Sequence, residues 1–177
     1  MDSLFVRRYD SSWLHFSLLI EGSFRFTTGY NIGLPSGAIH NPTIIAHELV
    51  HTYNSRLSPT LPTFLIEGLP DIIAVILTGS ALFEGFATFR KVSLAFDNRD
   101  PISPVLEESG NGLLLFKALL AEMGRDNFEA GVQSAFSMHW NITALEFLHA
   151  LKESAPRRNH VEDIYRAWIA DYIPDSA

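Results

Sequence analysis

Residues 41–51 read NPTIIAHELVH, and this stretch combines a helix start with polar side chains spaced for one helix face. Asn41 is a good N-cap, because its side-chain oxygen can accept hydrogen bonds from the first free backbone N–H groups. Pro42 suits the first helical position, where its missing N–H costs nothing. The apolar residues that follow predict a helix that continues to about Tyr53.

Two histidines and a glutamate give this helix its chemistry. His47 and His51 are four residues apart, so they project from one face one turn apart and can share a metal ion. Glu48 stands beside them, where it can take a proton from a zinc-bound water as general base. The alternative is that both histidines are ordinary polar members of a helix face. Two unpaired imidazoles beside Leu49 and Val50 would, however, be costly to bury without a ligand.

A catalytic zinc needs a third protein ligand, and Glu67 is the candidate. The chain has no cysteine, so any zinc must be held by histidines and carboxylates. Residues 61–70 read LPTFLIEGLP and present Glu67 in an otherwise apolar setting. The alternative for Glu67 is a solvated carboxylate or a helix cap. We expect one Zn²⁺ per chain, although cobalt or manganese could occupy the same ligands.

Asp71 lies four residues after Glu67 and has two interpretations. If one helix runs through both residues, the Asp71 carboxylate can accept the free ring N–H of a zinc-binding histidine and orient that ring. If Pro70 interrupts the helix instead, Asp71 is an ordinary carboxylate of a first helical turn, favoured by the helix dipole.

The composition and the residue pattern of the whole chain predict a single α+β domain over residues 1–177. It is 47% hydrophobic, with a charged fraction of 19%, which is the composition of a folded protein. Residues 1–40 are β-rich, with alternation over residues 23–27, and residues 41–177 are helical. Further helices are expected at residues 64–77, from Asn111 to Met123, from a cap at Asp126 to about His139, from the capping box of Thr143 and Glu146 to Ser154, and after Asn159.

Charge and hydropathy exclude several classes of partner. The formal net charge of −7 argues against nucleic acid, which normally needs a basic surface. The most apolar run, residues 72–77, is much shorter than the roughly 20 residues of a membrane span. The first residues include Asp2, Arg7 and Arg8 and do not form a signal peptide. We therefore expect a cytoplasmic protein without a membrane span.

The two motifs together resemble a known family. HELVH followed by LPTFLIEGLPDIIA is similar to the gluzincin pattern of zinc metallopeptidases, HExxH with a downstream W-L-x-E-G-F/L-A segment. The catalytic domain of the aminopeptidase N family is the first match, and the glycyl aminopeptidase family is the second, through HTYNSRLSP at residues 51–59. The likeness continues through GNGLLLFK after residue 109 and AWIADYIP near the end, so it covers about residues 40–175. It implies a thermolysin-like zincin fold, peptide-bond hydrolysis, and the same metal ligands and general base.

The chain also departs from this family. The relatives carry a tyrosine that stabilises the oxyanion, and Ser109 occupies the matching position here. Tyr53, His139 and His149 are the possible substitutes. The segment G-x-M-E-N, which reads a free substrate N-terminus in the family, is absent, so exopeptidase specificity is not carried over.

Three functions remain open at the level of the sequence. The first is a zinc metallopeptidase acting on a peptide or protein substrate. The second is a catalytically impaired zincin-like module with a binding or structural role. The third is a fragment of a larger aminopeptidase-like enzyme, with a possible partner domain or subunit.

Overall fold

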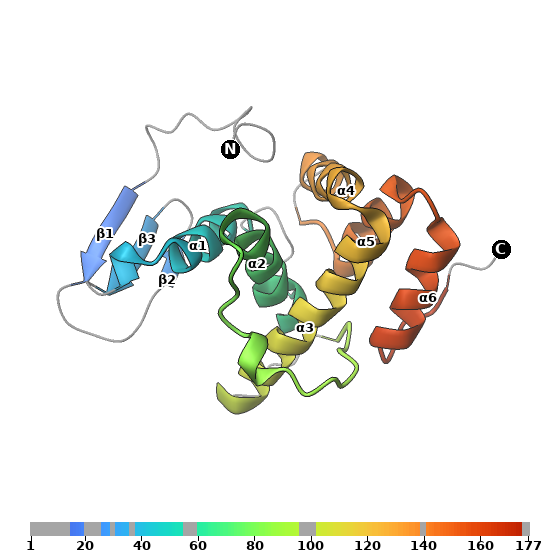
Figure 1. Cartoon of the computed structure of the whole chain (residues 1–177), viewed down its shortest axis with the longest axis horizontal. Coiled ribbons are helices and arrows are strands. Elements are labelled where there is room, and N and C mark those ends of the chain that lie inside the picture. Colours follow the sequence, from blue (N-terminus) through green and yellow to red (C-terminus); the bar gives the residue numbers. More distant parts are fainter. Residues whose placement is uncertain are drawn as a thin grey trace.

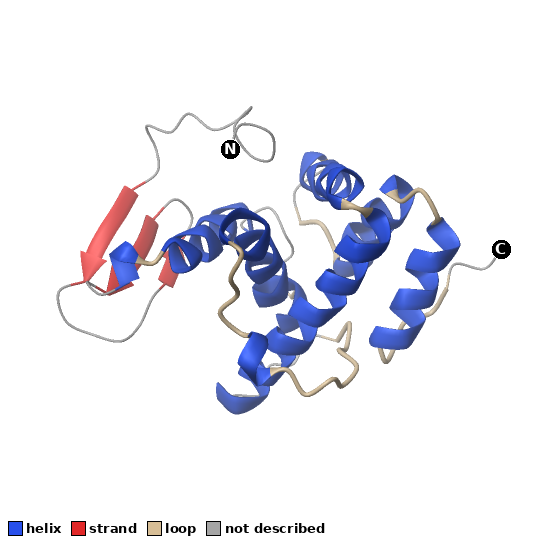
Figure 2. Cartoon of the chain, in the orientation of Figure 1, coloured by secondary structure: helices blue, strands red, loops and turns tan. Residues whose placement is uncertain are grey.

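The computed structural model describes residues 15–19, 26–28, 31–35, 38–54, 60–95, 102–138 and 141–174 (Figure 1). Its elements in chain order are β1 (His15–Leu19), β2 (Phe26–Thr28), β3 (Asn31–Pro35), η2 (Ala38–His40), α1 (Pro42–Asn54), α2 (Thr63–Thr78), η3 (Glu84–Phe86), α3 (Ile102–Met123), α4 (Arg125–Ser137), α5 (Ala144–Ser154) and α6 (Arg158–Trp168). Helices dominate the described residues (Figure 2). The strands lie at one end, α4 to α6 at the other, and α1 to α3 between them.

The three strands form a small sheet in the order β1-β3-β2. β1 runs parallel to β3, with Phe16 opposite Ile32, and β2 runs antiparallel to β3, with Thr27 opposite Ile32. Leu34 of β3 is buried in a small cluster with Ala38, against the half-buried Ile45 of α1. Most of residues 1–40 lies outside the described ranges, so the β-rich character of that whole segment stays a prediction.

Helix α1 begins as its sequence predicts. The side-chain oxygen of Asn41 accepts hydrogen bonds from the backbone N–H groups of Thr43 at 3.0 Å and Ile44 at 3.3 Å. Ile44 and Leu49 face the small cluster at β3, while Val50 joins the main core on the other side. These opposite contacts place α1 between the sheet and α2.

Helix α2 is the central helix of the protein, and it continues through Pro70. Its side chains from Phe64 to Ala74 are almost all buried, as a helix covered on several sides requires. It ends at Gly79, which adopts the left-handed conformation with φ of 77° and donates its N–H to the carbonyl oxygen of Val75. No helix in the described part of the chain is both long and apolar enough to cross a membrane.

Two glycines allow α2 and α3 to cross in close contact. A Cβ atom on Gly68 would lie 2.8 Å from the carbonyl carbon of Gly112. A Cβ atom on Gly112 would lie 2.6 Å from the carbonyl oxygen of Phe64. Because these neighbours are backbone atoms, they cannot move aside as a flexible side chain would. The crossing therefore determines how closely the helix that carries Glu67 approaches α3.

Helix α3 is longer than its sequence predicts. It begins at Ile102, so the expected start at Asn111 is wrong. The side chain of Asn111 is buried in the middle of the helix, where it accepts the backbone N–H of Thr88 at 2.9 Å and donates to the Thr88 hydroxyl at 3.2 Å. In a sequence, an asparagine whose side chain hydrogen-bonds to a distant segment looks the same as an N-cap. Only the folded structure distinguishes these two roles.

The last three helices complete the core. Asp126 does not cap α4, which starts one residue earlier from Gly124, and Asp126 lies in its first turn. The capping box of Thr143 and Glu146 at the start of α5 is confirmed. α6 begins at Arg158, and its buried Tyr165 donates a hydrogen bond to the carbonyl oxygen of Leu148 at 2.7 Å. This bond joins α6 to α5.

We predict that Gly112→Ala lowers the free energy of unfolding by about 1–3 kcal/mol, because the added methyl group overpacks the crossing. Alanine is by itself a better helix former than glycine, so the steric cost must exceed that gain. Urea unfolding followed by circular dichroism measures the change. The control is Gly85→Ala, where nothing lies within 4 Å of the added Cβ. Equal stability of Gly112→Ala and wild type would contradict the close crossing.

Candidate metal centre

Helices α1 and α2 bring the three predicted ligands, His47, His51 and Glu67, close together. The Nε2 atoms of His47 and His51 lie 3.0 Å apart. One carboxylate oxygen of Glu67 lies 3.2 Å from the His47 Nε2 and 3.5 Å from the His51 Nε2. The spacing of four residues on α1 accounts for the first contact, and the packing of α2 on α1 for the other two.

Glu48 is the fourth polar side chain of the cluster. It is 3% exposed, and its ligand atom lies within 4.8 Å of those of His47 and His51. By this spacing Glu48 could itself be a third ligand. Glu67 is the better fit, because one of its oxygens contacts both imidazoles. Glu48 then lies beside the group formed by His47, His51 and Glu67.

Asp71 is fully buried, and its carboxylate lies beside the Nδ1 atom of His47. One of its oxygens lies 3.1 Å from Nδ1 of His47, on the side of the ring away from Glu67. The carboxylate also accepts the backbone N–H of Leu82 at 3.0 Å and that of Phe83 at 2.8 Å. Since α2 is continuous, Asp71 is not a carboxylate of a first helical turn. A neutral His47 with its proton on Nδ1, donated to Asp71, directs the Nε2 lone pair into the cluster.

The charges of the cluster perturb its pKa values. Burial lowers the pKa of His47, but the hydrogen bonds to Asp71 and Glu67 and their negative charges outweigh burial, so the pKa lies above 6.5. Burial raises the pKa of Glu67, and the hydrogen bonds and charges of His47 and His51 reverse this effect and hold it well below its usual value. Glu67 therefore remains an anion beside the two rings.

The cluster fits a tetrahedral zinc ion. Zinc bonds to histidine nitrogen and carboxylate oxygen are about 2.0–2.1 Å long, so neighbouring ligand atoms of a regular tetrahedron lie about 3.3 Å apart. The three observed separations lie on both sides of that value. The mouth of the cluster is on the side of Glu67 and His51, which are 26% and 14% exposed, whereas His47 is 1% exposed. Among the described residues of the cluster, Glu67 and His51 thus form its more exposed side.

Comparison with known proteins supports the fold. No protein-family model matches the chain, and no curated protein matches its sequence. Two solved structures match with high structural similarity. The first is the M1 zinc metallopeptidase from Deinococcus radiodurans, with a TM-score of 0.66 and 17% identity over 93% of this chain. The chain has the fold of part of an M1 zinc metallopeptidase.

The second structure is a mutant of a two-domain M1 zinc metallopeptidase bound to the amino acid L-tryptophan. Its TM-score is 0.64, with 16% identity over 93% of this chain. The chain spans 42% and 43% of the length of these two proteins. The match therefore covers less than half of each enzyme, and it supports the likeness to gluzincins at the level of the fold.

The structure locates only some of the oxyanion candidates. Ser109 is buried, and its hydroxyl donates to the carbonyl oxygen of Val105 at 2.6 Å, within its own helix. His149 is exposed on α5 and is not among the residues brought to the cluster; it lines a hollow with Tyr165 and Tyr172. His139 and the side chain of Tyr53 lie outside what the structure describes.

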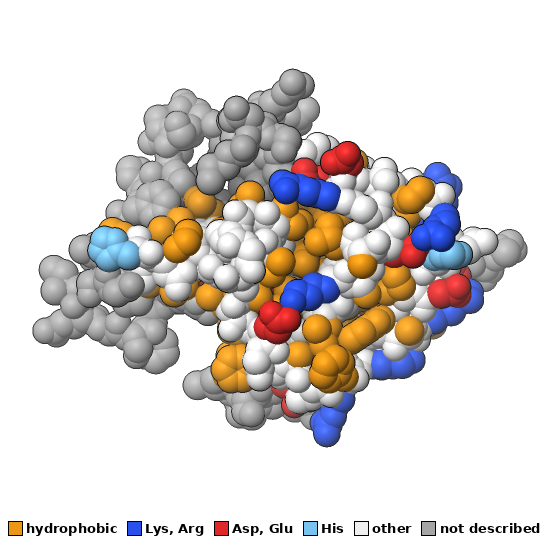
Figure 3. Space-filling view, in the orientation of Figure 1, with side chains coloured by type: hydrophobic (Ala, Val, Ile, Leu, Met, Phe, Trp, Pro, Cys, Tyr) orange, Lys and Arg blue, Asp and Glu red, His pale blue; other side chains and the backbone are white. Residues whose placement is uncertain are grey.

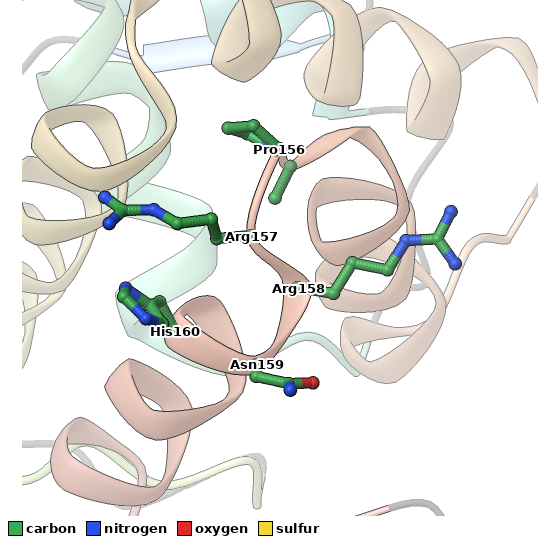
Figure 4. Close-up of a pocket in the computed structure, with 6 residues that line it drawn as sticks. Pro156, Arg157, Arg158, Asn159 and His160 are labelled. Atoms are coloured by element: carbon green, nitrogen blue, oxygen red, sulfur yellow. The ribbon is translucent and has the colours of Figure 1, made fainter.

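A hollow of about 430 Å³ at the start of α6 is separate from the cluster (Figure 4). Arg157 and His160 point to one side of it and Arg158 to the other. These three side chains already have carboxylate partners, since Arg157 and His160 contact Glu122, and Arg158 contacts Glu153. The hollow therefore offers no free cation to an anionic ligand.

One contact of the cluster was not predicted from the sequence. The ring of Phe83 and the imidazole of His47 pack in a T-shaped arrangement, with 5.4 Å between the ring centroids. The aromatic residues between Phe83 and Phe96 were its only signal, and a composition of this kind does not say which ring meets the histidine.

We predict that the imidazole of His47 in the metal-free protein titrates above pH 6.5 and that Asp71→Asn lowers this pKa, because the amide carries no charge. Since the folded-state pKa is raised, protonated His47 stabilises the metal-free protein below about pH 6.5, and the contribution is lost as the pH rises through the folded-state value. NMR titration of the ring protons measures the pKa. Asp163→Asn on the exposed face of α6 is the control. An unchanged pKa in Asp71→Asn would refute the coupling.

Proposed function

We propose that this chain hydrolyses peptide bonds with a zinc ion held by His47, His51 and Glu67. The observation that carries the proposal is the triangle of two imidazole nitrogens and one carboxylate oxygen, whose sides of 3.0, 3.2 and 3.5 Å suit a tetrahedral ion. The fold shared with M1 zinc metallopeptidases supports it independently.

Each residue of the centre has a part in the reaction. When bound, zinc polarises a carbonyl group and lowers the pKa of a coordinated water toward neutrality. Glu48 accepts a proton from the attacking water and later delivers one to the leaving amine. Asp71 holds the ring of His47 in one orientation, with its proton on Nδ1. Glu67 balances part of the charge, because its pKa stays low beside the histidines.

The substrate is a peptide or protein that reaches the centre from the side of His51 and Glu67. Basic and acidic side chains are interspersed on the face in Figure 3, which shows no continuous basic patch of the kind that nucleic-acid binding normally needs. Since the chain spans less than half of the two solved enzymes, further parts of the substrate site belong to a partner domain or subunit in this proposal.

A catalytically impaired module is the second candidate function, and the bonding of Ser109 favours it. The Ser109 hydroxyl is committed to Val105, so it is not directed at a substrate carbonyl as the family tyrosine is expected to be. Losing one such donor lowers the rate by about 10² to 10³. A peptide-library assay with and without zinc separates the two functions, because zinc-dependent cleavage eliminates the impaired module.

We predict about one zinc per purified chain and its loss in the double variant His47→Ala, His51→Ala, because two of the three ligands are then missing. Plasma emission spectrometry after dialysis measures the metal content. His160→Ala, at a histidine on α6 that is 53% exposed, is the control and should keep its zinc. Absence of zinc from wild-type protein supplied with zinc would overturn the proposed site.

We predict that Glu48→Gln lowers peptide hydrolysis by at least about 10²-fold while zinc stays bound, because the amide cannot accept the proton. Single-turnover cleavage and metal content are measured on the same sample. Glu153→Gln, on the exposed side of α5, should keep full activity. Cleavage by Glu48→Gln at the wild-type rate would show that another group is the base.

A further inference from the structure

The segment after α2 approaches the metal centre through its backbone and one side chain. The backbone N–H groups of Leu82 and Phe83 donate to the buried carboxylate of Asp71. The same carboxylate contacts Nδ1 of His47 at 3.1 Å. The position of Phe83 is therefore tied to the position of His47 through a single buried group.

The side chain of Phe83 makes a second, direct contact with the same histidine. Phe83 is 7% exposed, and its ring meets the imidazole at an interplanar angle of 68° with 5.4 Å between the centroids. The His51 ring also packs against the His47 ring, with 4.8 Å between the centroids. An imidazole with Asp71 at Nδ1, Glu67 at Nε2 and rings packed against it has little freedom to rotate.

Helix α3 holds this segment in place. A Cβ atom on Gly110 would lie 2.7 Å from the carbonyl oxygen of Phe83 and 2.6 Å from the backbone nitrogen of Ala87. Within the segment, the N–H of Phe86 donates to the carbonyl oxygen of Phe83 at 3.0 Å. The side chain of Glu84 forms an ion pair with Lys117 of α3. The Phe83 ring is thus supported by a helix that contributes no metal ligand.

We propose that Phe83 is a positioning residue for the metal centre, which fixes the ring plane of His47 and thereby raises zinc affinity. This inference rests on the proposed zinc site and adds to it a residue that is neither a ligand nor a hydrogen-bond partner of a ligand side chain. The ring contact limits rotation of His47, which the single hydrogen bond from Nδ1 restrains only in part. Pre-orientation of a ligand raises metal affinity, because less freedom is lost on binding.

The test compares Phe83→Leu and Phe83→Ala with Phe86→Ala. Leucine keeps the side chain apolar but removes the aromatic ring. Phe86 is the matched control, because it lies in the same segment, is 48% exposed and packs its ring on Phe83. Zinc affinity is measured by competition with a chromophoric chelator, and the visible spectrum of the cobalt-substituted protein reports ligand geometry. Thermal unfolding of the metal-free proteins reports folding separately.

We expect Phe83→Leu to raise the zinc Kd about tenfold or more and to change the cobalt spectrum, as loss of supporting contacts around a metal ligand typically does. Phe86→Ala should leave both close to wild type. A folded Phe83→Leu with wild-type Kd and spectrum overturns the inference while leaving the zinc site intact. If wild-type protein binds neither zinc nor cobalt, the proposed site fails and the inference fails with it.

Discussion

The buried carboxylate of Asp71 is the constraint on which the rest of the centre depends. It is fully buried, so its charge is stable only if nearby donors replace the water it has lost. Two backbone N–H groups and the His47 ring lie within hydrogen-bonding distance of it. Removing one partner of a buried charged pair typically costs about 3–5 kcal/mol. The same three contacts that satisfy Asp71 therefore orient His47 and hold the turn after α2.

The continuity of α2 makes this arrangement possible. Glu67 and Asp71 lie one turn apart on the same face of α2, so Glu67 reaches Nε2 of His47 while Asp71 reaches Nδ1. Pro70 lies between them without ending the helix, because the tight packing of α2 against α1 and α3 outweighs the lost hydrogen bond. The glycines of the α2–α3 crossing add to this packing. Local propensity alone would have broken the helix at the position where the site needs it intact.

Helix starts predicted from the sequence were confirmed where the capping side chain bonds to its own first turn. They were wrong where the side chain bonds to a distant segment or the chain turns earlier. The caps at Asn41 and Thr143 are formed by side chains that bond to their own first turns, so short sequences specify them. Asn111 looks like a cap but is satisfied by Thr88, more than twenty residues away. The expected cap at Asp126 lies two residues after the observed cap, Gly124, where the chain already turns into α4.

The sequence by itself determined the chemical inventory of the candidate centre: two histidines on one helix face, a glutamate beside them, a further carboxylate downstream, and no cysteine to compete as a ligand. The histidine pair can be predicted from the sequence because helix periodicity places residues four apart on one face. Only the tertiary structure showed that one Glu67 oxygen lies close to both histidines, which of its two interpretations Asp71 follows, and that Phe83 packs against the His47 ring. Such contacts join separate segments, and their distances arise from helix packing, which no local pattern of residues encodes.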